Sequence, residues 1–153
     1  MRRSIKLVLG SVFALLILGG GIVWFIFSDK FDDTSGIDAD YSIAADDLLA
    51  ELRNGTTVVN KKYTEKILDV AGIVSEIESL DTLVNLKFTD SSTGNYLIFT
   101  FQDKSVPEAN KLAEGVSVVV RGSCSGATHS DILDLNYISF KRSAIIKKQN
   151  NQK

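Results

Sequence analysis

The sequence has few of the residues that build metal sites, disulfide frameworks and repetitive scaffolds. Its 153 residues include one proline, one cysteine, one histidine and one methionine. A structural zinc site needs four tetrahedral ligands, which Cys124 and His129 alone cannot supply. An intramolecular disulfide needs a second cysteine. With 44% hydrophobic and 24% charged residues, the chain also lacks the biased composition of collagen-like and wholly disordered proteins.

The formal net charge of −2 conceals an uneven distribution of charge along the chain. Residues 1–6 and 141–153 contain basic residues and no acid. Residues 7–140 hold 9 basic and 19 acidic residues, a net charge of −10. Affinity for nucleic acid comes largely from Lys and Arg side chains that displace counterions. The acidic middle of the chain therefore disfavours a nucleic-acid partner.

Residues 7–27 contain no charged side chain. As a helix they would extend about 31 Å, close to the roughly 30 Å thickness of the bilayer hydrocarbon. Cleavage at Gly19-Gly20-Gly21 would leave a mature chain that begins with a second apolar run, and the apolar stretch is longer than that of a cleaved signal peptide. The sequence therefore predicts an uncleaved, single-pass signal anchor in the cytoplasmic membrane.

Flanking charges predict the orientation of this span. The basic end, residues 1–6, precedes it, and an acidic linker over residues 28–40 follows it. Positive charge marks the cytoplasmic side of a membrane helix. We therefore expect a cytoplasmic N-terminus and an extracytoplasmic C-terminal domain.

Periodicity predicts a mainly β domain with some helix over residues 41–140. Ser42 can cap a helix over residues 42–63, which Asn54-Gly55 interrupts with a kink or a restart. Strand patterns and one short helix follow. Strands are expected over residues 66–77, 82–88, 95–102, 116–124 and 131–140, and a helix over residues 105–115. Gly72 lies inside the first strand, where a bulge or bend is the usual reason.

Three strands, a short helix and two further strands form the element order of an OB-fold, a five-stranded Greek-key barrel. We therefore expect a five-stranded OB-fold barrel preceded by a helix, with the short helix between strands three and four. The basic segment 141–153 is expected to be a disordered tail.

Two sequence blocks resemble one family. The leading helix ends in Asn60-Lys61-Lys62-Tyr63, followed by Lys66 and the run from Val70 to Val74. Gly115, Val118, Val120, Gly122, Cys124 and Gly126 match a "G-x-x-V-x-V-x-G-x-C-x-G" strand. Residues 41–140 thereby resemble the tRNA_anti-like family, a group of bacterial OB-fold domains that often follow a signal or an anchor. The resemblance implies a likeness to anticodon-binding OB domains. Family members often carry a second cysteine on the last strand, which this chain lacks.

Nothing in the sequence indicates an enzyme. Thr128-His129-Ser130-Asp131 has the residue types of a nucleophilic triad, but contiguous residues in a turn seldom reach triad geometry. There is no phosphate-binding loop or dinucleotide fingerprint. We therefore expect no catalytic residue, no metal and no cofactor.

Cys124 has two interpretations. A lone cysteine at a strand end is commonly a small buried hydrophobe. In an exported protein it can instead form an intermolecular disulfide. A homodimer through Cys124 or the membrane helix therefore stays open.

An OB-fold usually binds its ligand on the face of strands two and three and on the loops that join strands one–two and four–five. Here that surface would include the loops 75–81 and 125–131. The candidate ligand-binding residues are Asn85, Lys87, Tyr96, Thr100 and His129.

The sequence predicts a membrane-anchored, non-enzymatic OB-fold binding module. Its expected partners are the lipid bilayer and another envelope protein, a peptide or an oligosaccharide. Single-strand binders need stacked aromatics in a basic groove, and Tyr96 is the one outward aromatic predicted on the face. The alternative is an OB-fold that binds single-stranded or tRNA-like nucleic acid, which the family resemblance supports and the acidity and location oppose.

Overall fold

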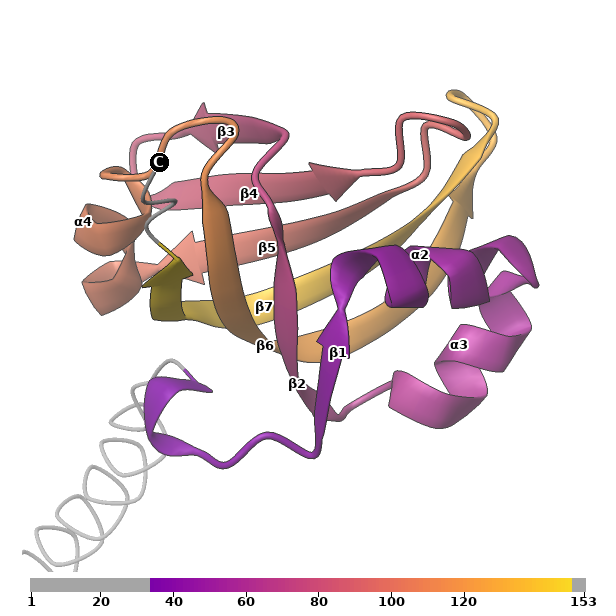
Figure 1. The fold of residues 1–153 in the computed structure, drawn as a ribbon, viewed down its shortest axis with the longest axis horizontal. Coiled ribbons are helices and arrows are strands. Elements are labelled where there is room, and N and C mark those ends of the chain that lie inside the picture. The colour runs from indigo at the N-terminus through magenta and orange to yellow at the C-terminus, as the bar shows by residue number, and fades with distance from the viewer. Residues whose placement is uncertain (1–33, 150–153) are drawn as a thin grey trace, which may run out of the picture. The chain divides into compact units, whose positions relative to one another are not determined.

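The computed structural model describes residues 34–149 (Figure 1). The predicted cytoplasmic end, membrane span and first part of the linker lie outside these residues. Within the described part, no helix combines the length and the apolar character needed to cross a membrane. Residues 34–149 contain seven strands, two helices of eight or nine residues and three shorter helical segments. In chain order the elements are η1 (Thr34–Gly36), β1 (Tyr41–Ala44), α2 (Ala45–Arg53), α3 (Thr56–Tyr63), β2 (Ile67–Ile73), β3 (Glu76–Ser79), β4 (Leu83–Thr89), β5 (Tyr96–Gln102), η2 (Asp103–Ser105), α4 (Val106–Ala109), β6 (Ser117–Ser130) and β7 (Leu135–Gln149).

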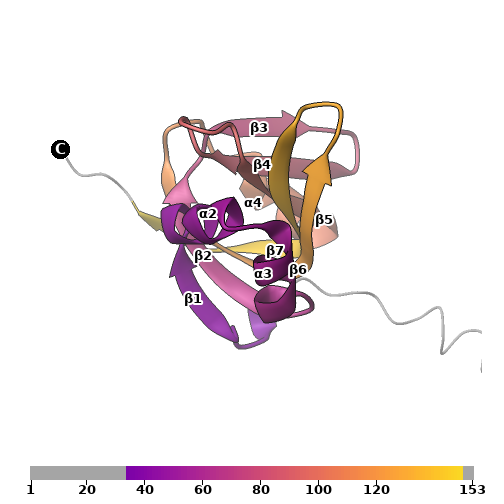
Figure 2. The same ribbon diagram turned by 90° about the vertical axis from the view of Figure 1, so that its right-hand side faces the viewer.

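The strands pair as those of an OB-like barrel. The sheet order is β1-β2-β6-β7-β5-β4-β3. All pairs are antiparallel except β1–β2 and β5–β7, which are parallel. β2 pairs with β6 near one end of this strand order, and β3 pairs with β4 at the other end. Since β3 follows β2 directly in the chain, the segment from Ile67 to Ser79 connects the two ends of the sheet. Figure 2 shows the same ribbon from the end at which α2 and α3 lie.

The prediction of five strands is wrong in number. The first predicted strand is divided at Val74 and Ser75 into β2 and β3. The Val74 N–H donates to the Val116 carbonyl at 3.0 Å, whereas the Ser75 N–H donates to the Lys87 carbonyl at 2.9 Å. The chain thus changes its partner from the β6 side to β4 within two residues. The added strand β1 pairs with β2 at the edge of the sheet.

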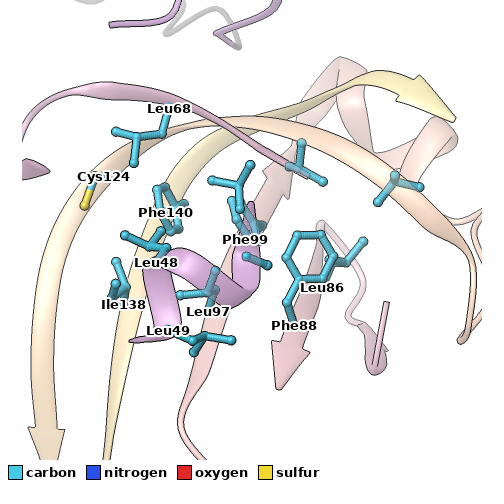
Figure 3. Close-up of a cluster of buried hydrophobic side chains, with 14 of the residues drawn as sticks. Leu48, Leu49, Leu68, Leu86, Phe88, Leu97, Phe99, Cys124, Ile138 and Phe140 are labelled. Carbon is cyan, nitrogen blue, oxygen red and sulfur yellow. The ribbon is translucent and has the colours of Figure 1, made fainter. Parts of the chain in front are cut away.

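Alternate residues of the strands fill the barrel. Val84, Leu86 and Phe88 of β4 face Leu97, Phe99 and Phe101 of β5, and these side chains are at most 2% exposed. The Phe99 and Phe140 rings stack with centroids 4.4 Å apart. Leu48 and Leu49 of α2 enter the same cluster (Figure 3). The helix therefore belongs to the barrel core.

The leading helix begins later than predicted. Ser42 lies in β1, where it is paired with Asp69, and Ala44 is the residue before α2, with no side-chain cap. Backbone pairing with β2 fixes this segment as a strand, and it overrides the local cap. The predicted restart is confirmed at Asn54-Gly55, because Gly55 has φ of 120° and separates α2 from α3.

The C-terminal half also departs from its predicted boundaries. The predicted helix over residues 105–115 is shorter, since α4 ends at Ala109. The predicted loop over residues 125–131 belongs largely to β6, and the predicted tail belongs to β7 as far as Gln149. Ala144 and Ile145 pair with Arg121 and Val120, and Ala144 is 4% exposed. Long-range pairing along β6 therefore orders residues that look like a tail in the sequence.

Residues 34–40 of the predicted linker pack on the barrel. Thr34 is fully buried, and its hydroxyl lies 3.0 Å from the Arg142 carbonyl. Arg121 donates from Nη1 to the Ile37 carbonyl at 2.6 Å. The same guanidinium binds both carboxylate oxygens of Asp69, at 2.6 and 2.8 Å. Arg121 thus ties this segment to β2 and β6.

Asp90 connects the β4–β5 turn to α2 and gives the fold a pH dependence. Hydrogen bonds from Ser92 and Thr93, together with Arg53 at 2.6 Å, hold the pKa of Asp90 well below its ordinary value of 3.8. A depressed carboxyl pKa adds stability above the unfolded pKa, and that stability is lost as the pH falls through the folded value. We expect Asp90→Asn to lower the free energy of unfolding at neutral pH, with a difference from wild type that shrinks below pH 3.8. Urea unfolding at several pH values measures this; a difference that stays constant with pH would contradict it.

Candidate functional site

Four of the five predicted site residues lie on one outward face. Asn85 and Lys87 alternate with the buried residues of β4, and Tyr96 and Thr100 alternate with those of β5. All four side chains are half-buried. With Tyr137 of β7 they form a surface that we call the tyrosine face.

The centre of the tyrosine face is a stack of two tyrosines. Tyr96 pairs in register with Tyr137, and their rings are 5.3 Å apart with an interplanar angle of 7°. The ammonium of Lys87 lies 5.6 Å from the centroid of the Tyr96 ring. Because β5 lies between β4 and β7, the Tyr96 ring is held between Lys87 on one side and Tyr137 on the other. Burial raises the pKa of Tyr96 above its ordinary value.

Charges and amides on this face satisfy one another. Lys87 donates to the Glu76 carboxylate at 2.9 Å, across the β3–β4 pair. Thr100 donates from its hydroxyl to the Asn85 side-chain oxygen at 2.9 Å. The one cation of the tyrosine face is therefore neutralised. Ile98, half-buried and paired with Lys87, lies between Tyr96 and Thr100 on the same side of β5. A ligand therefore meets an aliphatic side chain as well as hydrogen-bonding groups and ring edges.

His129 does not join the tyrosine face. It pairs with Asn136, one residue before Tyr137, so its side chain lies on the other side of the β6–β7 ribbon. Nδ1 lies 3.0 Å from Oδ1 of Asn136, and Nε2 lies 3.7 Å from both Asp131 and Asp134. The structure places His129 at the end of β6, outside the tyrosine face, and a ligand role for it stays a prediction. The pairing of β6 with β7 shifts register between Cys124 and Gly126, upstream of His129.

Sequence reasoning missed Tyr137. The alternation of Ile138 and Phe140 toward the core already places Tyr137 outward. The sequence did not show that Tyr96 lies beside Tyr137, because β5 and β7 lie far apart in the chain. The predicted flanking loops are also shorter, since Glu76–Ser79 is β3 and the β6–β7 turn is Asp131–Asp134.

The two blocks that carry the family resemblance meet in space where α3 packs on β6. Asn60 donates from Nδ2 to the Ala127 carbonyl at 2.9 Å and accepts from the Ala127 N–H at 2.6 Å. Beside it, Gly126 has φ of 118°, and a Cβ there would lie 2.8 Å from Oδ1 of Asn60. The backbone of Cys124 pairs with residues 65 and 66 just after α3. These motif residues therefore fix α3 on the barrel.

Cys124 lies in the barrel core. Its side chain is 1% exposed near Leu68, and burial raises the pKa of its thiol (Figure 3). A disulfide between two copies would require the barrel to open locally. The geometry thus favours the packing interpretation of Cys124.

The described residues give no metal cluster. Within residues 34–149, no group of three His, Cys, Asp or Glu side chains is placed to hold a metal ion. The four contiguous residues Thr128–Asp131 end β6 and begin the turn. Ser130 there accepts a hydrogen bond from the Leu133 N–H at 3.4 Å and forms no hydrogen bond with His129.

Solved structures resemble this fold. A candidate nucleic acid-binding lipoprotein from Klebsiella pneumoniae aligns with a TM-score of 0.55 and 15% identity, over 69% of this chain and 91% of that chain. Asparaginyl-tRNA synthetase from Entamoeba histolytica, in complex with asparaginyl-adenylate, aligns with a TM-score of 0.39 and 20% identity, over 57% of this chain and 22% of that chain. An OBody bound to hen egg-white lysozyme aligns with a TM-score of 0.41 and 17% identity, over 60% of this chain and 94% of that chain. The first of these likenesses supports the OB-like fold.

Sequence comparison gives the family. No curated protein matches the chain. The sequence profile of the tRNA_anti-like family matches residues 1–137, which is most of the chain and includes both motif blocks. The chain therefore belongs to the tRNA_anti-like family.

Proposed function

We propose that this protein is a non-enzymatic binding module whose ligand lies on the tyrosine face, and that the ligand is a protein segment, a peptide or an oligosaccharide. The observation that carries the proposal is the Tyr96–Tyr137 stack, on the same face as the Asn85–Thr100 pair and separated from it by the Lys87–Ile98 pair. OB-folds commonly bind their ligands on this face. Tyrosines combine an apolar ring with a hydroxyl, which suits partners that are partly polar.

The arrangement of the rings argues against base stacking as the main contact. A base needs a free aromatic face, and Tyr96 has Tyr137 on one side and Lys87 on the other. Lys87 is also bound by Glu76, so a phosphate would have to compete with that carboxylate. Ring edges, the tyrosine hydroxyls and the side-chain nitrogen of Asn85 remain, and such groups recognise peptide and sugar hydrogen-bonding groups.

The sequence supports a location of the barrel outside the cytoplasm. The uncharged segment 7–27, preceded by basic and followed by acidic residues, supports a single-pass anchor in the cytoplasmic membrane with the barrel outside the cytoplasm. Such a module would meet envelope proteins and polysaccharides far more often than nucleic acid.

Nucleic-acid binding is the second candidate. The candidate nucleic acid-binding lipoprotein from Klebsiella pneumoniae, at 15% identity, shares the fold. Outward aromatic rings near a lysine are also a known element of single-strand binding surfaces. The net charge of −10 over residues 7–140 opposes this candidate.

Binding of the full chain to a fluorescent single-stranded oligonucleotide, compared at low and high salt, separates the two. We expect weak binding of the oligonucleotide. A triple variant should abolish this residual binding, because its lysines belong to the basic C-terminal segment; the substitutions are Lys147→Gln, Lys148→Gln and Lys153→Gln. Tight, salt-sensitive binding that persists in this triple variant and is lost in Tyr96→Ala would overturn the proposal.

A second experiment screens arrays of peptides and oligosaccharides for ligands. We expect ligands whose affinity falls about tenfold or more in Tyr137→Ala. Ile73→Ser, an exposed residue of β2 away from the face, is the control.

A further inference from the structure

The N-terminal segment of the barrel docks beside the basic C-terminal strand. The hydroxyl of the fully buried Thr34 lies 3.2 Å from the Arg121 carbonyl of β6 and 3.0 Å from the Arg142 carbonyl of β7. Arg121 alternates with the core residue Val120, so this contact is on the outside of the β6–β7 ribbon. Ala144 pairs with Arg121 and is only 4% exposed, because η1 packs on both strands here. Two segments from opposite ends of the described chain therefore share one outer surface.

Two lysines of β7 lie on either side of this contact. Lys141 pairs with Ser123 and Lys147 pairs with Val119. Each of these partners is two residues from Arg121 along β6, a distance of about 7 Å. Both lysines are exposed, and among residues 34–149 no carboxylate lies within ion-pair distance of either ammonium. Their charges are therefore available to a partner outside the barrel.

Two isoleucines accompany the lysines. Ile37 is 47% exposed, and its carbonyl accepts a hydrogen bond from Nη1 of Arg121 at 2.6 Å. Ile146 is 40% exposed and is an extra residue of β7 where the pairing with β6 shifts register, directly before Lys147. Apolar side chains next to lysines are the combination with which proteins lie in a membrane interface. We call the surface formed by Ile37, Lys141, Ile146 and Lys147 the entry face.

The entry face differs in charge from the rest of the domain. Two carboxylates lie near it, and Arg121 offsets part of their charge: its pKa is raised by hydrogen bonds to Asp69 and by the nearby charge of Asp38. Arg121, Arg142 and the two lysines make four cations against these two acids. Residues 7–140 together carry a net charge of −10. An anionic surface would therefore attract the entry face and repel much of the remaining domain.

The length of the preceding chain indicates which anionic surface is within reach. The predicted membrane span ends at Phe27, six residues before Thr34. Six residues reach about 20 Å when fully extended. The entry face of an anchored chain therefore stays near its own bilayer, and contacts that are weak one by one act as if their ligand were concentrated. A partner that diffuses freely has no such advantage.

We infer that the barrel rests on the bilayer that holds its anchor, with Lys141 and Lys147 at anionic phospholipid headgroups and Ile37 and Ile146 in the interface. This inference rests on the proposed membrane location. It goes beyond the proposed function, because it assigns a lipid-contacting surface that uses no residue of the tyrosine face.

Fluorescence quenching by spin-labelled lipid tests this inference on the full chain in vesicles. Ile146→Cys carries an environment-sensitive fluorophore, and Val58→Cys is the control. Val58 is 50% exposed on α3, which lies at the other end of the barrel from the indigo η1 (Figure 1). Cys124 is 1% exposed, and the unsubstituted chain measures its background labelling. In vesicles that contain phosphatidylglycerol, we expect about twofold or more quenching at position 146 relative to position 58.

Charge variants of the labelled chain identify the cause of the quenching. K141E/K147E should remove the difference between the two positions, whereas K141R/K147R should retain it, because both arginines keep the positive charge. High salt and vesicles of phosphatidylcholine alone should reduce the difference as well. The substituted lysines are exposed, and circular dichroism verifies that each variant is folded.

Three results would overturn the inference: equal quenching at the two positions, a difference that phosphatidylcholine alone supports equally well, or a difference that K141E/K147E leaves unchanged. Flotation of the vesicles tests the location separately. A chain that floats with the vesicles without a quenching difference contradicts only this inference, whereas a chain that does not float contradicts the anchor as well. Tyr137→Ala should leave the quenching unchanged, so failure of the tyrosine-face proposal is also distinguishable.

Discussion

Replacing Gly72 by alanine is expected to lower the free energy of unfolding by about 1–3 kcal/mol, the usual cost of adding a methyl group to a packed core. A Cβ at position 72 would lie 2.7 Å from Cδ2 of Phe88 and 2.9 Å from the Cβ of Ala45. Neither neighbour can move freely. Phe88 is 2% exposed and packs against Phe99, and Ala45 begins α2.

Gly36→Ala is the matched control for this prediction. A Cβ at position 36 would meet no atom within 4 Å, and Gly36 has no positive φ, so alanine there should change the free energy of unfolding by less than about 0.5 kcal/mol. Urea denaturation measures both variants, and equal slopes with denaturant indicate that only stability has changed. Equal stability of the two variants would show that α2 does not press on the barrel at Gly72. The sequence suggested a bulge or a bend at this glycine. In the structure Gly72 pairs in register with Val118, and close packing against Phe88 and Ala45 is the reason for the glycine.

The sequence predicts the barrel well because its signals there are local. Alternation in β4 and β5 correctly separates Asn85, Lys87, Tyr96 and Thr100 from the core. Pro107 correctly indicates the start of the short helix α4, which lies between β5 and β6. Each of these features depends on residues within one element.

Two expectations fail because of contacts between segments far apart in the chain. Ser42 is a good local cap, yet pairing of β1 with β2 makes it a strand residue. The predicted tail is ordered as far as Gln149 because β7 pairs with β6. The stack of Tyr137 on Tyr96 requires the parallel pairing of β5 and β7. Reading the face of an OB barrel from sequence therefore needs the strand order, in addition to the alternation within each strand.

The second large effect is expected at Asn60, where the two family motif blocks meet. Its side-chain amide reproduces a pair of strand hydrogen bonds with the backbone of Ala127, which is 7% exposed. Alanine at position 60 would remove both bonds and leave a nearly buried N–H and carbonyl without their partner. We expect Asn60→Ala to lower the free energy of unfolding by about 2–4 kcal/mol, since each unsatisfied buried group costs about 1–3 kcal/mol.

Two further variants separate hydrogen bonding from other consequences of the change. Asn60→Asp keeps an acceptor for the Ala127 N–H but places a carboxylate against the Ala127 carbonyl, so it should also destabilise the protein. Lys61→Ala, at an exposed position of the same helix, should change the free energy of unfolding by less than about 0.5 kcal/mol. Thermal or urea unfolding compares the three, and an unaffected Asn60→Ala would show that α3 is not fastened to β6 through this amide.

The same variants also distinguish a structural motif from a binding motif. Asn60 and Gly126 belong to the blocks that identify the family, so a ligand role for them is an obvious hypothesis. If Asn60 contacted a ligand, its substitution would reduce affinity while the free energy of unfolding stayed close to that of wild type. The side-chain nitrogen and oxygen of Asn60 are instead both bonded to Ala127, and the oxygen also accepts from the Thr64 hydroxyl at 3.4 Å. A Cβ at Gly126 would lie 2.8 Å from that oxygen, so a side chain there would displace Asn60. We therefore expect the reverse, with stability lost and the affinity of the folded fraction for any tyrosine-face ligand retained.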